Sequence, residues 1–336
     1  MGQEKEVGRK KRCIMTDWRN LTKNTFISLD ECDLDDTTYF IPCYADLRPV
    51  RDSISAQGII NKPLLQKTKE GKYVPVLGRR RLLAARQIGL RGIEARVLED
   101  DVSERMLYEV AFWDNKSHRE FEVCTKAVVV HRLLELFSRE EVADRFLPAL
   151  GIPPYGPRIE ALCRIATLER DIHALMASGR LNEKTALLLS YLTRDDRRDI
   201  ITLIDRLKPN INKAAEIISG VLDLATHRGC SVQDILSIPQ IREPLTDPKT
   251  SDLTALTDTV RKALRRLRYP DLYNEEVRFF EWLRKQRLPV NVTVRPTQAY
   301  EDKSCTIEIK VESREQAAAL VKKIMTIKGG DLSPRL

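Results

Sequence analysis

The chain has 336 residues, 42% of them hydrophobic and 32% charged, which is enough for two or three domains with hydrophobic cores. Its 57 lysine and arginine residues outnumber the 49 acidic ones, and the net charge of +8 favours a nucleic acid or another phosphate-rich partner. No apolar run follows the basic N-terminal residues, which argues against a secretory signal or membrane anchor and predicts a cytoplasmic protein with no membrane partner.

The seven cysteines and four histidines are dispersed along the chain. None of them forms a C-x-x-C pair or an H-E-x-x-H motif, so we expect no zinc site. The chain also lacks the Gly-x-x-x-x-Gly-Lys-Ser/Thr sequence of a P-loop and the Gly-x-Ser-x-Gly sequence of a hydrolase nucleophile. We therefore assign no catalytic residue.

The first 115 residues fall into two parts. Residues 1–24 are basic and weakly periodic, and we expect them to form a mobile tail. Residues 25–115 alternate short apolar runs of strand length with helix-forming stretches, which predicts a small α/β domain.

The most informative segment of this domain begins with two apolar runs, 58–65 and 73–77, which lead through Gly78 into a helix rich in alanine, leucine and arginine. Three consecutive arginines, Arg79, Arg80 and Arg81, open that helix. Because a helix N-terminus has free N–H groups and the positive end of the helix dipole, three added cations make the place suitable for a phosphate. The alternative interpretation is a solvated basic helix start.

Residues 116–236 have helical periodicity throughout, and we expect a helical domain there. Within it, Ser138-Arg139-Glu140-Glu141 is a capping box, in which a serine hydroxyl and a glutamate satisfy backbone N–H groups reciprocally. The motif predicts that a helix begins at this point.

A second helix is expected from about Pro157, with apolar residues at i, i+3, i+4 and i+7 that leave Arg158 and Arg164 off the apolar stripe. The two helices have the outline of a helix-turn-helix. The expected turn, 147–156, has about ten residues instead of the usual three or four, so two ordinary packed helices are the alternative.

The C-terminal part begins with an expected linker, 237–252, which is rich in proline and polar residues. In residues 253–336, the helical periodicity predicts a helix with one basic face, followed by a second helix. Alternating apolar residues then predict strands near 290–294 and 307–311, and Ser313 is expected to cap a last helix. Two strands and a helix make a thin core, which favours a homodimer. The alternative is that the strands pack on the preceding helices in a monomer.

Three short segments occur in the order found in the N-terminal domain of ParB-type partition proteins. The family's Gly-Ile-Ile-Gln-Pro-like, Gly-Glu-Arg-Arg and Glu-Asn-x-x-Arg boxes correspond to residues 58–63, 78–81 and 114–119. Each match is partial, and the departures are Lys62 before Pro63, Arg79 in place of Glu, Leu83 in place of a later Arg, and His118 in place of Arg, with Arg119 one step on. The chain resembles this family over residues 25–195 by motif, and more loosely elsewhere.

The resemblance implies an α+β chain with a small α/β N-terminal domain, an all-helical central domain with a helix-turn-helix, and a small α+β C-terminal dimerisation domain. It also implies that the second helix of the helix-turn-helix faces the major groove of double-stranded DNA. The implied DNA contacts are Tyr155, Arg158 and Arg164, with Lys184 at a backbone phosphate.

In this family CTP and Mg²⁺ bind the N-terminal domain. By resemblance, the nucleotide contacts are Gly78, Arg79, Arg80, Arg81 and Asn115, and the metal ligands are Asp114 and Asn115. Because the chain departs from the family at Arg79, Leu83 and His118, we expect nucleotide binding more than hydrolysis, which would be weak at most.

The sequence thus predicts a homodimeric, site-specific DNA-binding protein of chromosome or plasmid partition, associated with the nucleoid and with a Walker-type partition ATPase. Two alternatives stay open. The N-terminal fold also resembles nucleases and small phosphotransferases, in which Asp114, His118 and Glu120 would supply acid–base or metal chemistry. A plain operator-binding repressor would share the DNA contacts without depending on a nucleotide.

Overall fold

In a computed structural model, the chain is described over residues 18–98, 102–246, 252–286, 288–296 and 305–311, and at residues 313, 318 and 321. Its contacts divide it into two compact units, Met1–Leu192 and Thr193–Leu336. The expected N-terminal domain and most of the expected helical domain therefore share the first unit. No helix within the described ranges has both the length and the apolar character that crossing a bilayer requires.

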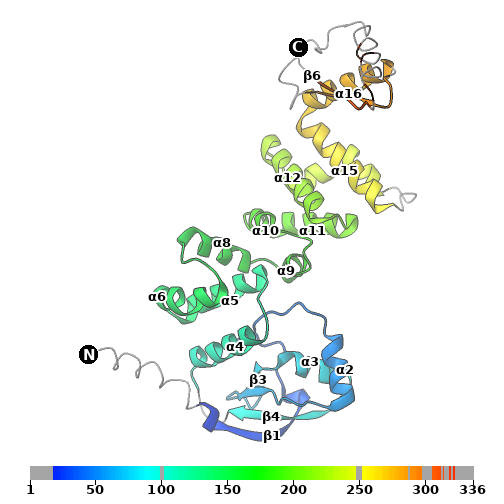
Figure 1. The fold of residues 1–336 in the computed structure, drawn as a ribbon. Coiled ribbons are helices and arrows are strands. Elements are labelled where there is room, and N and C mark those ends of the chain that lie inside the picture. The colour runs from blue at the N-terminus through cyan, green and yellow to red at the C-terminus, as the bar shows by residue number, and fades with distance from the viewer. Residues whose placement is uncertain are drawn as a thin grey trace. The chain divides into compact units, whose positions relative to one another are not determined.

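The first unit begins with a four-stranded sheet, of which Figure 1 labels β1, β3 and β4. The strand order is β1-β4-β2-β3. Its strands are β1 (Thr22–Ser28), β2 (Leu64–Lys67), β3 (Tyr73–Leu77) and β4 (Gly92–Leu98). β4 runs antiparallel to β1 and parallel to β2, and β2 and β3 form an antiparallel hairpin. The first expected apolar run becomes a strand only after Pro63, which has no N–H to donate to a ladder.

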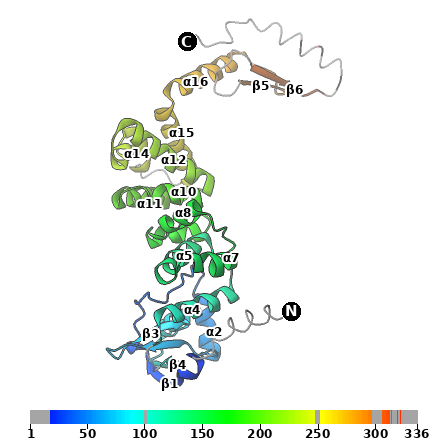
Figure 2. The ribbon, with the colours of Figure 1, turned by 90° about the vertical axis from the view of Figure 1, so that its left-hand side faces the viewer.

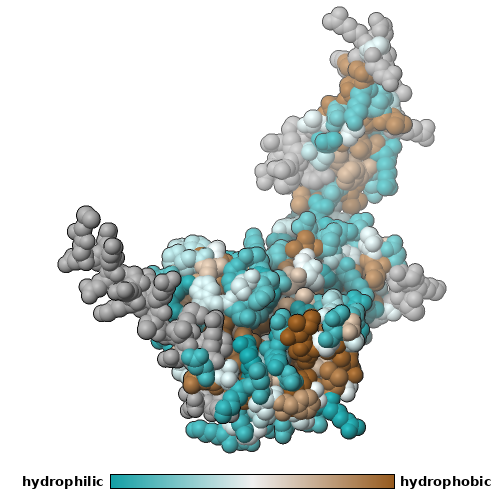
Figure 3. Space-filling model, turned by 60° about the horizontal axis from the view of Figure 1, so that its bottom comes forward, coloured by the Kyte–Doolittle hydropathy of each residue, from teal (hydrophilic) through white to brown (hydrophobic). Residues whose placement is uncertain are grey.

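Three helices accompany this sheet: α2 (Arg48–Gln57), α3 (Arg79–Gln87) and α4 (Glu104–His118). The core between α3 and the strands is formed by Ile27, Leu65, Leu82, Ala85, Ile93, Ala95 and Val97, all buried. On the molecular surface that faces the viewer in Figure 3, hydrophilic residues predominate, and hydrophobic residues form separate patches among them. Helix α4 continues through residue 115, so the expected domain boundary at that position falls inside a helix.

Residues 123–189 of the first unit are mainly helical (Figure 2). Its elements are α5 (Val123–Leu136), α6 (Arg139–Glu141), the π-helical turn η3 (Val142–Phe146), α7 (Leu147–Leu150), α8 (Gly156–Ala166), α9 (Arg170–Ala177) and α10 (Glu183–Leu189). The capping box predicted at Ser138 is confirmed, because its hydroxyl accepts the Glu141 N–H at 3.2 Å and the Glu141 carboxylate accepts the Ser138 N–H at 3.1 Å. Helix α5 packs against both α8 and α9.

The turn before α8 is shorter than the sequence predicts. In η3 the N–H of Leu147 donates to the carbonyl of Val142, which widens the helix by one residue immediately before Pro148. Pro148 cannot donate a backbone hydrogen bond, and this wider turn lets the helix continue through it to Leu150. Gly151, with a φ of 64°, ends the helix, and only residues 151–155 separate it from α8.

The second unit begins with four helices, α11 (Arg194–Leu207), α12 (Ile211–Arg228), α13 (Val232–Leu236) and α14 (Pro239–Thr246). The side chains of Thr193, Asn210 and Ser231 accept N–H groups at the starts of α11, α12 and α13, which explains where these helices begin. Helix α14 lies within the expected linker, and Ile241 is fully buried there.

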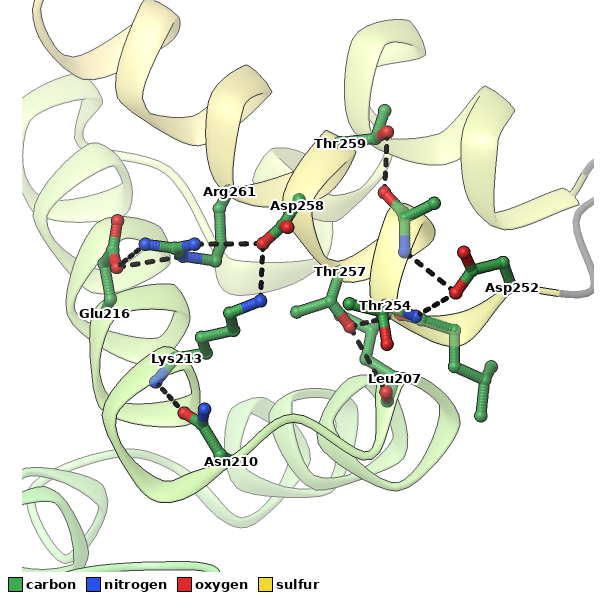
Figure 4. Close-up of polar contacts among 12 residues, drawn as sticks. Leu207, Asn210, Lys213, Glu216, Asp252, Thr254, Thr257, Asp258, Thr259 and Arg261 are labelled. Carbon is green, nitrogen blue, oxygen red and sulfur yellow. Dashed lines mark hydrogen bonds and ion pairs between the residues drawn. The ribbon is translucent and has the colours of Figure 1, made fainter.

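Helix α15 (Leu253–Arg268) packs on α12, α14 and α11 through the buried residues Leu256, Val260 and Leu264. A polar network reinforces this packing (Figure 4). Lys213 of α12 donates to Asp258 at 2.8 Å, and Arg261 donates to Asp258 at 3.0 Å and also to Glu216. The helix expected to open a separate C-terminal domain thus packs with the preceding helices.

The described remainder of the chain comprises α16 (Pro270–Lys285), β5 (Val292–Pro296) and β6 (Cys305–Ile309). The two strands pair antiparallel, with Val292 opposite Ile309, close to where the sequence predicts them. The helix expected after Ser313 falls mostly outside the described residues. Helix α16 buries Phe279 but leaves Val277 and Phe280 exposed, at 38% and 47%.

Candidate phosphate site and nucleic-acid interface

The first candidate site is the start of α3, where Gly78 connects it directly to β3. Gly78 has a φ of 85°, and a Cβ atom there would lie 3.2 Å from the Cα atom of Pro63 and 3.1 Å from Nη1 of Arg81. Glycine therefore fits both the left-handed backbone and the close approach of Pro63. No side chain among the described residues caps the helix, and its first turn has no acidic residue.

Arg79 is turned inward from this helix start. Its guanidinium donates to the carbonyl groups of Leu34 and Asp36 and lies 4.7 Å from the centre of the Phe40 ring. Burial lowers the pKa of Arg79 from its ordinary value, with nearby carboxylates acting in the opposite direction. Arg79 thus links the irregular segment 33–47 to α3 through hydrogen bonds, a role that the sequence did not predict.

Arg80 and Arg81 also donate to backbone carbonyls, at different places. Arg80 donates to the carbonyl of Asp46 at 2.5 Å and to Sγ of Cys43 at 2.7 Å. Arg81 donates to the carbonyl of Asn61 at 2.9 Å. Each guanidinium has five N–H donors, so these contacts leave donors for a ligand.

The charges of Arg80 and Arg81 at this helix start favour an anion, whereas the nearby carboxylates of Asp33, Asp35 and Asp36 offset the charge of Arg79. Within the described residues, no ion pair joins Arg79, Arg80 or Arg81 to a carboxylate. Carbonyl groups satisfy hydrogen bonds but do not neutralise charge, and the helix dipole adds positive potential at the same end. These features suit a phosphate group, and the phosphate site expected from the sequence stays a prediction.

Asp114 and Asn115 lie near the C-terminal end of α4 and are partly buried. Nδ2 of Asn115 donates to the carbonyl of Ala111 at 2.9 Å, which leaves the side-chain oxygen as an acceptor. No hydrogen bond or ion pair in the described ranges links either residue to 78–81, and no group of three His, Cys, Asp or Glu residues suited to a metal occurs there. Carboxylate and amide oxygens are nevertheless the ligand types that Mg²⁺ takes.

The three residues of the enzymatic alternative engage only in local contacts near the end of α4. Nδ1 of His118 lies 2.6 Å from the backbone carbonyl of Asp114, and Glu120 accepts from Lys116 at 2.5 Å. That hydrogen bond lowers the pKa of Glu120, which opposes a role as a general acid. We find no geometry among these residues that favours acid–base catalysis.

The second candidate site is α8 with the neighbouring α10. Tyr155, which precedes α8, is 63% exposed, and Arg164 and Lys184 are exposed. The guanidinium of Arg164 lies 4.6 Å from the ring centre of Tyr191, which is itself 62% exposed. Arg158 is placed differently, because its guanidinium pairs with the carboxylate of Glu183. Exposed aromatic and basic side chains therefore occur together around α8.

Comparison with characterised proteins gives no matching family model. Two curated proteins described as probable chromosome-partitioning proteins ParB are similar in sequence. The Campylobacter jejuni protein is 24% identical over 177 residues, which cover 52% of this chain and 60% of the relative. The Vibrio cholerae protein is 22% identical over 203 residues, covering 60% of this chain and 66% of the relative.

The chain is similar to ParB-type partition proteins. The resemblance predicted from the three boxes is thereby confirmed. The matches span somewhat less than two thirds of the length of each curated ParB relative.

Solved ParB structures are also found by comparison of folds. Two are C-terminally truncated ParB from Caulobacter crescentus, one complexed with CTP-γ-S and one with the centromeric parS site. The CTP-γ-S complex is 18% identical, with a TM-score of 0.25, and the match covers 54% of this chain and 98% of the ParB chain. The parS complex is 16% identical, with a TM-score of 0.30, and the match covers 65% of this chain and 99% of the ParB chain. A Pnob8-like ParB-N domain is 12% identical, and the match covers 76% of this chain and 96% of that domain's chain. Its TM-score is 0.34.

One residue of the third ParB-like box has a contact that the sequence reasoning missed. Arg119 donates to the carbonyl of Pro42, lies 4.8 Å from the ring centre of Phe121, and pairs with Glu122 at 3.4 Å. Pro42 belongs to segment 33–47, which Arg79 and Arg80 also hold. The second and third boxes thus converge on one irregular segment, and the only signal in the sequence was the displaced arginine after His118.

Proposed function

We propose that this chain is a site-specific DNA-binding protein of the partition class. The observation that carries the proposal is the exposed set of aromatic and basic side chains around α8, namely Tyr155, Arg164, Lys184 and Tyr191. The sequence similarity to ParB proteins supports the same function. Arginine and lysine neutralise DNA phosphates, and a planar guanidinium can also read a guanine edge.

In this proposal α8 is the helix that enters the major groove. It follows the capped helical stretch 139–150 after a short connection, as the second helix of a helix-turn-helix does. Lys184, at the start of α10, is proposed to contact a phosphate, which would fix the register of the protein on the duplex.

The proposed active form is a homodimer assembled through the C-terminal residues. Val277 and Phe280 of α16 are 38% and 47% exposed, and Ile307 of β6 is 42% exposed. A two-stranded ribbon and a helix have little core of their own, and a second copy would cover these apolar side chains. A two-fold dimer would present two α8 helices to a two-fold DNA site.

We further propose that the start of α3 binds the triphosphate of CTP. The free N–H groups of the first helical turn and the guanidinium groups of Arg80 and Arg81 would hold the phosphates. Asp114 and Asn115 would supply oxygen ligands to Mg²⁺, which would neutralise phosphate charge. By analogy with partition systems, a Walker-type ATPase would be the protein partner, and the DNA-bound protein would associate with the nucleoid.

The proposal is tested by incubating the full chain with a library of random duplexes and sequencing those it retains. The selected duplex and a shuffled duplex are then compared by fluorescence anisotropy at several salt concentrations. We expect a preference for the selected duplex, with Arg164→Ala losing it and Arg91→Ala, an exposed arginine before β4, retaining it.

Equal affinity for the selected and shuffled duplexes would contradict site-specific binding. Specific binding that neither CTP nor Mg²⁺ changes would instead favour an operator-binding repressor. A rate of dissociation from DNA that depends on the nucleotide would support the partition hypothesis.

A further inference from the structure

The two arginines of α8 that lie off its apolar stripe have opposite surroundings. Nη2 of Arg158 lies 3.0 Å from Oε2 of Glu183, and Nη1 donates to Oε1 of the same carboxylate. The pair is bidentate, and its side chains are 35% and 29% exposed. A fork-to-fork contact of this kind is among the stronger polar contacts available to arginine.

Glu183 is held in place independently of Arg158. It lies in the first turn of α10, where the helix dipole favours a carboxylate. The same turn is fixed by Asn182, whose side-chain oxygen accepts the N–H and the hydroxyl of Thr185, both at 2.8 Å. Arg158 therefore meets a carboxylate that is already positioned, and the pair joins α8 to α10.

Arg164 differs from Arg158 in its surroundings. Its side chain is exposed, and within the described part of the chain no carboxylate pairs with it. Its guanidinium is held by the ring of Tyr191 at 4.6 Å. A contact with an aromatic ring uses none of the hydrogen-bond acceptors that a guanidinium needs, so the N–H donors of Arg164 can still bind a phosphate or the O6 and N7 atoms of guanine.

We propose that Arg158 is a positioning residue that orients α8 through Glu183, and that Arg164, supported by Tyr191, makes the specific DNA contact. The assignment rests on the proposed DNA-binding function. It assigns different roles to two residues that the sequence analysis predicts as DNA contacts alike. If Arg158 left Glu183 for a base, it would leave a carboxylate uncompensated near the phosphates of the DNA, which is unfavourable.

The experiment exchanges the two charges. Arg158→Glu, Glu183→Arg and the double variant are compared in the full chain, by anisotropy on the selected duplex and by thermal unfolding. Each single variant juxtaposes like charges, so we expect a lower melting temperature and weaker specific binding. The double variant restores an ion pair with no change in net charge, although it places a cation at the start of α10, where the helix dipole favours an anion. We therefore expect both measurements to recover most, but not all, of what the single variants lose.

A second set of variants tests Arg164. Arg164→Ala should weaken binding to the selected duplex about tenfold or more, without lowering the melting temperature. Tyr191→Phe keeps the aromatic face and should retain binding, whereas Tyr191→Ala should weaken it. Arg91→Ala controls for loss of one positive charge.

Two results would overturn the inference. The first is a double variant that regains its melting temperature but not its specific binding, since Arg158 itself would then touch DNA. The second is unchanged binding by Arg164→Ala. If the unmodified chain selects no duplex, the proposed function fails, and so does the specific DNA contact proposed for Arg164. The melting temperatures would still show whether Arg158 and Glu183 are coupled.

Discussion

The hydroxyl of Thr257 in α15 donates a hydrogen bond of 3.2 Å to the backbone carbonyl of Leu207, at the end of α11. Lys208 ends α11 in a left-handed conformation, with a φ of 45°, and a helix end leaves carbonyl groups without partners in the helix. Thr257 satisfies one of these carbonyls and is itself 2% exposed. Helix α15 therefore completes the α11–α14 bundle, and the C-terminal elements outside that bundle begin with α16.

The first prediction concerns assembly. A chain ending at residue 268 keeps the α11–α15 bundle and loses α16 with all that follows, so we expect it to be folded and monomeric. Its affinity for a two-fold DNA site should fall, because two linked half-site contacts become one. Sedimentation velocity and anisotropy measure these two effects.

A chain ending at residue 252 is the matched comparison. It also lacks α15, and the apolar surface covered by Leu256, Val260 and Leu264 would be exposed. We expect this chain to unfold at a lower temperature than the one ending at residue 268. If the chain ending at residue 268 still forms a dimer, the principal interface lies within residues 1–268.

The second prediction concerns the arginines at the start of α3. Arg80→Ala should weaken binding of CTP with Mg²⁺ by about 1.5–3 kcal/mol, which is roughly 10- to 150-fold in Kd. Titration calorimetry with CTP, ATP and GTP, each with Mg²⁺, measures the affinity and the base preference. Arg91→Ala should leave both unchanged.

Arg79→Ala should act mainly on stability, because the Arg79 guanidinium is occupied by the carbonyl groups of Leu34 and Asp36. Its melting temperature should fall more than that of Arg80→Ala. Absence of heat with all three nucleotides, from protein that still binds DNA, would make this helix start a structural element only.

The features that could be predicted from the sequence are those fixed by neighbouring residues. Ser138 opens a helix because its hydroxyl reaches an N–H three residues on, and that geometry needs no tertiary contact. The helix start at Gly78 and the beginning of α8 near Pro157 follow from equally local backbone preferences. Alternating apolar residues likewise predicted β5 and β6 to within two residues.

The features that could not be predicted depend on contacts between distant segments. Glu183 is far from Arg158 in sequence, and nothing around either residue indicates the pair that occupies the Arg158 guanidinium. The carbonyl partners of Arg79 belong to an irregular segment without periodicity. For the same reason the prolines around α14 predict a linker, whereas the burial of Ile241 against neighbouring helices favours a helix there.

The third prediction concerns pH and two buried thiols. Burial raises the pKa of Cys32 and of Cys124 from 9.0 to about 11. The folded chain therefore holds both thiols protonated while the unfolded chain releases their protons, so the free energy of unfolding should decrease as pH rises from about 9 to about 11. Below that range these thiols contribute no pH dependence.

Urea unfolding at about pH 8 and about pH 10 measures this effect. Other groups titrate in the same range, so each variant is compared with the unmodified chain at both pH values. Cys32→Ala and Cys124→Ala should lose less stability on going to the higher pH than the unmodified chain does. Cys43→Ala, which removes a partly buried thiol, is the matched control, and an equal loss in all four proteins would contradict the prediction.

The last prediction separates two reasons for glycine at the start of α3. Gly78 and Gly89 have similar left-handed backbones, with φ of 85° and 79°, but a Cβ atom at Gly89 would meet nothing within 4 Å. Gly89→Ala should therefore show the backbone effect alone, about 1–2 kcal/mol of stability. At Gly78 the Cβ atom would also press on Pro63 at 3.2 Å, and overpacking adds about 1–3 kcal/mol. Urea unfolding of both variants measures the difference, and equal losses would mean that Pro63 yields to the added methyl group and that the left-handed turn alone requires glycine.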